Sequence, residues 1–212
     1  MICNDHRFIY TKVGKTGSAS IQEQLIKLGG NQQHLDHYHI LDDINENTQN
    51  YFKFTFVRNP WARCVSRYFY VKSRQGERYN MYKNSTFNEY IKAKGPPYED
   101  NDDRKFLLTF DWCSHSPNLQ KLYEKKHPFE NQVDWISDEH GKVLTDFVGK
   151  FENLQEDFNA VCDKIGIPHQ QLPHKNKTNH KHYTEYYDDE TRSIVAEKYA
   201  KDIEYFGYEF GE

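Results

Sequence analysis

Near the start of the chain, apolar and polar positions change from the spacing of a strand to that of a helix. Arg7–Thr11 is rich in β-branched and aromatic residues and predicts a strand. In Thr16–Leu28, apolar residues recur every three or four positions, and Gly29 and Gly30 follow them. This spacing predicts a helix that ends at the two glycines.

A second strand and a second helix follow. Tyr51–Val57 alternates aromatic and polar residues and then becomes fully apolar, which is typical of a central strand. Asn59 and Pro60 favour a helix start, because Pro suits the first helical position. Trp61–Ser73 then continues the predicted helix.

The later part of the chain contains four more predicted elements. Gln132–Ile136 and Leu144–Phe151 favour strands, whereas Leu154–Ile165 and Asp188–Ile203 have the amphipathic spacing of helices. The stretch 74–126 is polar and predicts no regular element. Because strands and helices alternate, the sequence predicts an α/β fold. We expect a single domain of residues 1–212 with a central, mostly parallel β-sheet flanked by helices.

Composition narrows the class of protein and its partners. The 212 residues include 16 Tyr and 14 Phe, so we expect a core rich in aromatic rings. Mean hydropathy is low, at −1.00, but disordered chains are poor in aromatic residues. The net charge of −4 argues against nucleic-acid binding, which needs an excess of Lys and Arg.

The four cysteines are widely spaced and form no CxxC pair, so we expect neither a zinc ribbon nor a disulfide scaffold. Reduced thiols favour a cytoplasmic protein. The sequence has no apolar run long enough to span a membrane and no signal-peptide core after Met1, so we expect no stable membrane insertion. An N-terminal anchor that preceded this sequence would leave the same pattern.

The segment Thr11–Ile21 has the features of an anion-binding loop. A strand leads into small residues and a lysine, and the loop opens a helix. Small residues let backbone N–H groups approach an anion closely, and the helix N-terminus adds about half a positive charge. Gly14-Lys15-Thr16 matches the end of a Walker A loop. However, Ile9 stands where the first glycine of that loop belongs, which argues against a standard NTPase.

A second motif follows the Tyr51–Val57 strand. Arg58 stands at the carboxyl end of this strand, which is where open α/β sheets bind ligands. Ser66 lies in the helix that follows. A forked guanidinium and a hydroxyl at this spacing can bind one phosphate together.

Together the two motifs resemble the sulfotransferases that use 3′-phosphoadenosine 5′-phosphosulfate (PAPS). The closer match is to the carbohydrate-type branch, which includes heparan 2-O-sulfotransferases and bacterial relatives. The family loop V/I-P-K-T/C-x-S/G-T/S-S corresponds to Val13–Ser20, with Gly14 in place of proline. The family pattern R-N/D-P-x-x-R-x-x-S fits Arg58–Ser66 at every defined position. Val148–Phe158 and His174–Tyr187 also resemble bacterial members.

The resemblance implies a P-loop-like sulfotransferase fold and transfer of a sulfuryl group from PAPS to an acceptor hydroxyl. The acceptor is expected to be a small molecule or a glycan, and the transfer needs no metal. Lys15 would stabilise the leaving phosphate. Arg58 and Ser66 would bind the 3′-phosphate, and the basic loop would close over the donor. The expected donor-binding residues are Lys15, Thr16, Gly17, Ser18, Ala19, Ser20, Arg58, Ser66, Lys175 and Lys177, and either lysine of the last pair can instead contact the acceptor.

The acceptor hydroxyl needs a general base, for which His is suited near neutral pH. Carbohydrate-type relatives have this histidine between the two motifs. His37 and His39 are equal candidates here, because their spacing to the following apolar residues does not separate them. We expect His34 to be a loop residue.

Two other classes of protein fit part of the pattern. A non-catalytic nucleotide- or polyanion-binding module would keep the loop but lack the base. A phosphotransferase with a variant P-loop would need an acidic Mg²⁺ ligand at a strand end, and the sequence has no apolar strand that ends in Asp.

Overall fold

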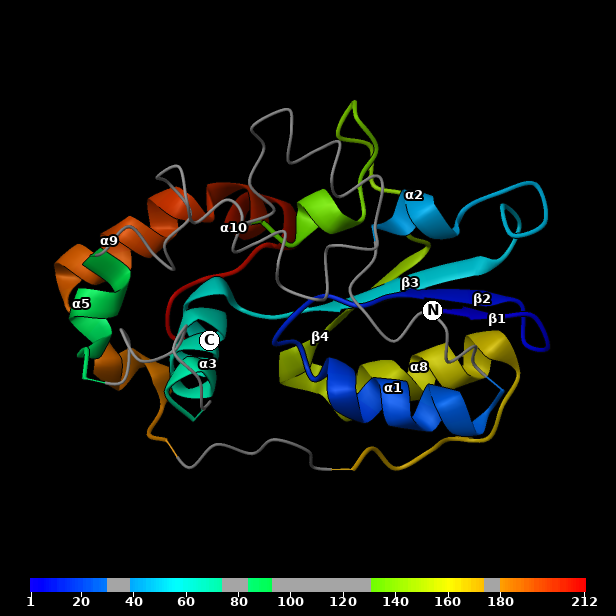
Figure 1. The fold of residues 1–212 in the computed structure, drawn as a ribbon, viewed down its shortest axis with the longest axis horizontal. Helices are drawn as coiled ribbons and strands as arrows, with labels where there is room; N and C mark the ends of the chain where they lie inside the picture. Colours follow the sequence, from blue (N-terminus) through cyan, green and yellow to red (C-terminus); the bar gives the residue numbers. More distant parts are fainter. Residues whose placement is uncertain (30–38, 74–83, 93–130, 174–179) are drawn as a thin grey trace. The chain divides into compact units, whose positions relative to one another are not determined.

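The computed structural model describes residues 1–29, 39–73, 84–92, 131–173 and 180–212. They form an α/β fold with a mostly parallel sheet and flanking helices, which confirms the predicted fold class (Figure 1). The chain divides into two compact units, one of Met1–Arg58 with Leu108–Lys175 and one of Asn59–Leu107 with Asn176–Glu212. The first unit contains the sheet, and the described part of the second is helical. The assignment of one domain to residues 1–212 stays a prediction.

The sheet of the first unit has four strands in the spatial order β1-β2-β3-β4. β2 (Phe8–Thr11), β3 (Phe52–Val57) and β4 (Phe147–Lys150) are parallel, and β1 (Ile2–Cys3) pairs antiparallel with β2. The predicted strands at Arg7–Thr11 and Tyr51–Val57 are thereby confirmed. Since parallel strands point the same way, the carboxyl ends of β2, β3 and β4 meet at one edge of the sheet.

Aromatic residues fill the core on one face of this sheet, as the composition predicted. The ring of Phe54 lies 5.6 Å from that of Phe8 and 5.2 Å from that of Tyr10. Helices α1 (Ser18–Lys27) and α8 (Leu154–Ile165) cover this face, and α2 (Ile40–Asp43) lies on the other side (Figure 1). The buried residues that these two helices contribute are Ile21, Leu25, Phe158, Val161, Cys162 and Ile165. Both helices lie where the amphipathic spacing predicted them.

Of the two strands predicted in the later part of the chain, one is present and the other is not. Leu144–Phe151 contains β4, although the strand covers only Phe147–Lys150. The prediction of a strand at Gln132–Ile136 was wrong, because this segment is the 3-10 turn η2 (Val133–Trp135). Its apolar residues are buried although the segment is a turn. The Gln132 side chain, instead of a strand backbone, pairs with the Arg58 main chain.

The second unit contains α3 (Pro60–Ser73), α5 (Phe87–Lys92), the 3-10 turn η4 (Tyr183–Tyr186), α9 (Asp189–Lys198) and α10 (Ala200–Phe206). The helix predicted for Asp188–Ile203 is broken at Tyr199, whose backbone leaves the helical range at φ −108° and ψ 27°. Beyond the break, Asp202 of α10 is fully buried and pairs with Arg63.

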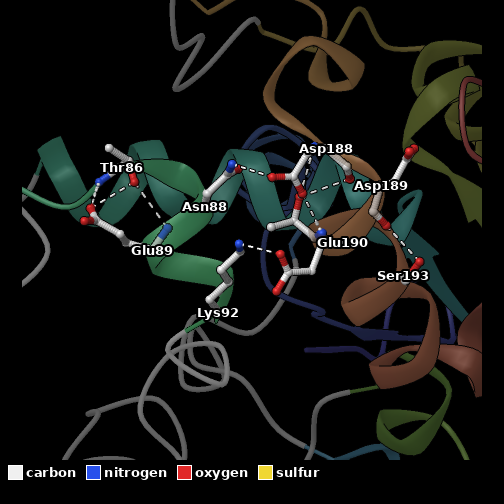
Figure 2. A network of polar contacts seen from close by, with 9 residues as sticks. Thr86, Asn88, Glu89, Lys92, Asp188, Asp189, Glu190 and Ser193 are labelled. Atoms are coloured by element: carbon white, nitrogen blue, oxygen red, sulfur yellow. Dashed lines mark hydrogen bonds and ion pairs between the residues drawn. The ribbon is translucent and has the colours of Figure 1, made fainter.

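Polar contacts connect α5 to the start of α9 (Figure 2). Asn88 Nδ2 donates to Asp188 Oδ2 at 2.7 Å, and Lys92 Nζ lies 2.6 Å from Glu190 Oε2. Asp188 also caps α9 by accepting the Thr191 N–H at 2.8 Å. These pairs are exposed and contribute little, so the buried residues of α5 carry most of its packing.

Two general expectations can be compared with the described residues. Cys3, Cys64 and Cys162 are free thiols and all three are buried, whereas Cys113 lies outside the described residues. Within the described ranges, none of the helices is both long enough and apolar enough to cross a membrane.

Candidate active site

The anion-binding loop connects the carboxyl end of β2 to the start of α1. Thr16 is fully buried, and its hydroxyl donates to the Val13 carbonyl at 2.9 Å, which closes the loop on itself. Two residues have left-handed backbones, Lys15 at φ 70° and Gly17 at φ 76°. A lysine in this region costs about 1–2 kcal/mol, and such strain concentrates at ligand sites.

Gly17 is the N-cap of α1 and packs closely against the start of α8. A Cβ atom placed on it would lie 2.8 Å from Leu154 Cδ2 and 3.2 Å from Phe151 Cδ2. Glycine is therefore needed here both for its backbone angle and for space. The first N–H groups of an α-helix have no acceptor within the helix, so Ser18 and Ala19 offer donors at this end.

Arg58 follows the last residue of β3 and is held by its main chain. Its N–H donates to Gln132 Oε1 at 2.9 Å, and Gln132 Nε2 donates to its carbonyl at 2.8 Å. Gln132 is fully buried. Its side-chain amide therefore pairs with the Arg58 main chain as the backbone of a neighbouring strand would. The guanidinium lies over the Phe151 ring, with Cζ 4.0 Å from the centroid, and Nη1 reaches the Lys15 carbonyl at 3.5 Å. The structure thus brings the two sequence motifs together at one edge of the sheet.

The remaining residues of the second motif belong to the second unit, with Asn59 directly before α3 and the others on it. Asn59 Oδ1 accepts the N–H of Trp61 at 3.1 Å, which caps the helix, and Asn59 Nδ2 donates to the Glu209 carbonyl at 2.8 Å. Arg63 lies 4.0 Å from the buried Asp202, which gives it a structural partner. Ser66 is buried on the same helix. Its role beside Arg58 stays a prediction.

His39 is fully buried and uses both ring nitrogens. Nδ1 accepts the Leu41 N–H at 3.2 Å, so the proton lies on Nε2, which donates to the Asp134 carbonyl at 3.0 Å. Burial lowers the pKa of His39, and its hydrogen bonds to backbone carbonyls only partly oppose this effect. His39 also caps α2 with Asp42 as its partner. These contacts give His39 a structural role.

Several predicted residues lie outside the described residues: His34, His37, Lys175 and Lys177. At the end of the basic loop, His180 stacks on Phe69 with the ring centroids 5.2 Å apart. The Tyr186 hydroxyl accepts the Lys181 N–H at 3.0 Å. The described part of the loop is therefore anchored by aromatic residues. Over the described ranges, no group of three or more His, Cys, Asp or Glu side chains is arranged to bind a metal ion.

Sequence reasoning missed two residues that hold Arg58, namely Gln132 and Phe151. Both come from segments far from Arg58 in the chain, and neither stands in a motif that signals such a role. Phe151 is the last residue of the predicted Leu144–Phe151 strand, and this position is the one sequence signal that could have placed it near the carboxyl edge of the sheet.

Residues 1–209 match the sequence model described as the Sulfotransferase family, and the chain therefore belongs to this family. This confirms the resemblance of the two motifs, and the α/β fold agrees with it.

The relatives include carbohydrate sulfotransferase 9 of Homo sapiens, which is 28% identical over 93% of this chain and 46% of that protein. Carbohydrate sulfotransferase 14 of Danio rerio is 25% identical over 98% of this chain and 61% of that protein. An uncharacterized protein of Archaeoglobus fulgidus is 32% identical over 56% of this chain and 70% of its own length. The chain spans about half the length of the carbohydrate sulfotransferases it matches. No solved structure gives a significant match.

Proposed function

We propose that this protein is a PAPS-dependent sulfotransferase that acts on a carbohydrate hydroxyl. The observation that carries the proposal is the contact of the Arg58 guanidinium with the Lys15 carbonyl, at 3.5 Å. PAPS has negative groups at two separate positions, the 5′-phosphosulfate and the 3′-phosphate. A helix N-terminus with a lysine, next to a guanidinium on the neighbouring strand, offers matching positive groups. The residues present therefore fit this co-substrate.

The loop and the start of α1 have distinct parts in the proposed transfer. The backbone N–H groups of Gly17, Ser18 and Ala19, with the Ser20 hydroxyl, bind the 5′-phosphosulfate. The bond between sulfur and the bridging oxygen breaks, and the Lys15 ammonium stabilises the negative charge that builds on that oxygen. The acceptor oxygen forms the new bond to sulfur. Arg58, with Ser66, binds the 3′-phosphate, and Lys175 and Lys177 add positive charge around the donor or the acceptor.

We infer that His37 is the base that takes the proton of the acceptor hydroxyl. The inference is supported by the contacts of His39, whose ring nitrogens are both engaged with backbone groups. A base needs a ring nitrogen within hydrogen-bond reach of the acceptor. His39 instead uses both of its ring nitrogens to hold the backbone.

The carbohydrate acceptor is proposed from the names of the relatives. We propose that residues of the polar stretch 74–126 bind the acceptor, since binding residues concentrate in loops. A cytoplasmic location and the absence of a nucleic-acid partner stay predictions from composition.

The test is a transfer assay with PAPS that carries radiolabelled sulfate, over a panel of glycans, phenols and amines. We expect label in at least one glycan and little in the amines. Binding of PAPS without transfer to any acceptor would identify a non-catalytic nucleotide-binding module. Transfer of phosphate from ATP in place of sulfate would identify a variant P-loop phosphotransferase.

A further inference from the structure

The Phe151 ring contacts both halves of the candidate active site. Its centroid lies 4.0 Å from Arg58 Cζ, and its Cδ2 atom would lie 3.2 Å from a Cβ atom on Gly17. Arg58 follows β3, and Gly17 begins α1 after the anion-binding loop. One side chain therefore touches the two segments that are proposed to bind the two ends of the donor.

The surrounding backbone fixes the position of this ring. Phe151 follows β4 directly and opens the 3-10 turn η3 (Phe151–Asn153), which leads into α8. The N–H of Lys150 donates to Asp157 Oδ2 at 2.6 Å, which ties the end of β4 to α8. Gly149 lies so close to the Phe56 ring that an added Cβ would overlap it. A side chain supported in this way can hold another side chain in place.

The stack suits a guanidinium that has to bind an anion. A cation over a ring face is attracted by the ring quadrupole when it lies within about 6 Å of the centroid. The ring packs against the flat face of the guanidinium. The N–H donors of the guanidinium lie in its plane and point outward from its edge. The stack therefore fixes the plane of the group without using its donors. One edge nitrogen, Nη1, is already directed at the Lys15 carbonyl.

We propose that Phe151 is a positioning residue, which holds the Arg58 guanidinium in the orientation that binds the 3′-phosphate and ties this subsite to the 5′-phosphosulfate loop through Gly17. The inference rests on the proposed function. Without the ring, the arginine side chain has to be ordered when the donor binds, and that cost weakens binding. The loss should affect ligands that carry a 3′-phosphate and spare those that lack it.

The test compares two nucleotides by calorimetry, 3′-phosphoadenosine 5′-phosphate and adenosine 5′-phosphate, which lacks the 3′-phosphate. Phe151→Leu should weaken binding of the first by about 5- to 30-fold, the equivalent of about 1–2 kcal/mol for a cation–π contact. Binding of the second should stay within about twofold. Phe151→Tyr keeps the ring face and should bind like the wild type. Phe147→Leu, at the start of β4 and partly buried against the core cluster, is the matched control and should change neither affinity.

A double-mutant cycle separates positioning from general stability. In the Arg58→Ala background, Phe151→Leu should cause no further loss, because the residue through which it acts is gone. An equal loss for both nucleotides, or the same loss with and without Arg58, overturns the inference. Phe151→Met also removes the ring, and it gives a second measurement if the leucine variant folds poorly. Tight binding of 3′-phosphoadenosine 5′-phosphate that depends on Arg58 but not on Phe151 overturns the inference alone, whereas a wild type that binds neither nucleotide overturns the proposed function as well.

Discussion

Replacing His39 by Asn separates its structural role from catalysis. Asn is a favoured N-cap residue and can still accept the Leu41 N–H, which His39 Nδ1 accepts at 3.2 Å. It is too short to replace the bond of Nε2 to the Asp134 carbonyl, at 3.0 Å. Losing this buried bond should lower the free energy of unfolding by about 1–3 kcal/mol. His39→Ala also loses the cap and should cost about 1 kcal/mol more.

The same substitution should change how stability depends on pH. Burial lowers the pKa of His39, so the unfolded chain, with a His pKa of about 6.5, binds more protons than the folded protein below that pH. The stability contributed by neutral His39 is therefore fully present above about pH 6.5. It is lost as the pH falls toward the folded pKa, with a slope of up to about 1.4 kcal/mol per pH unit. This contribution should be missing from His39→Asn.

Urea unfolding at about pH 7.5 and about pH 5.5 measures both effects. Transfer of labelled sulfate by the folded variants then gives the catalytic comparison. His39→Asn should keep most of its activity at the higher pH, whereas His37→Asn, the matched variant, should lose about 10²- to 10⁴-fold as a missing general base does. A His39→Asn variant that is as stable as the wild type but inactive, together with an active His37→Asn variant, would refute the structural role of His39.

Three further substitutions test the geometry of the site. Gly17→Ala should lower the free energy of unfolding by about 2–4 kcal/mol, because it adds overpacking against Leu154 to the backbone strain, and thermal or urea unfolding measures this loss. Gly166→Ala has a similar φ of 72° with open space around it and should cost only about 1 kcal/mol, and equal losses would remove the packing argument. Arg58→Ala should weaken binding of 3′-phosphoadenosine 5′-phosphate by about 10- to 100-fold in calorimetry, with an unchanged affinity counting against the assignment of the second motif. Gln132→Leu breaks two hydrogen bonds to the Arg58 main chain and should destabilise the protein by about 2–4 kcal/mol in urea unfolding.

The sequence predicted the parts of the fold that depend on local pattern. The Phe8–Thr11 strand, the loop and α1 form one continuous segment, in which residue spacing, small residues and the final glycines all agree. α8 is predicted at Leu154–Ile165, with Gly166 in the left-handed conformation that ends it. These elements position the anion-binding loop, so the place of this loop in the fold could be predicted from the sequence alone.

The sequence did not predict what depends on contacts between distant segments. The segment of η2 resembles a strand in pattern, yet the Gln132 side chain before it pairs with the Arg58 main chain, and the Asp134 carbonyl accepts a hydrogen bond from His39 Nε2. Neither contact leaves a trace in local spacing. Local spacing also gave no sign of the role of Phe151, which depends on its contacts with Gly17 and Arg58. The proposal that His37 rather than His39 is the base also depends on such contacts, because both ring nitrogens of His39 are engaged with the backbone.

We propose above all that Lys15 stabilises the phosphate that leaves when sulfate is transferred. The most direct measurement is the single-turnover rate of labelled sulfate transfer from PAPS to a glycan acceptor by Lys15→Ala, compared with wild type at saturating donor. We expect the rate to fall by about 10²- to 10³-fold, as it does when a group that stabilises developing charge is removed, while the variant remains folded. A Lys15→Ala protein that transfers sulfate at the wild-type rate would contradict the account.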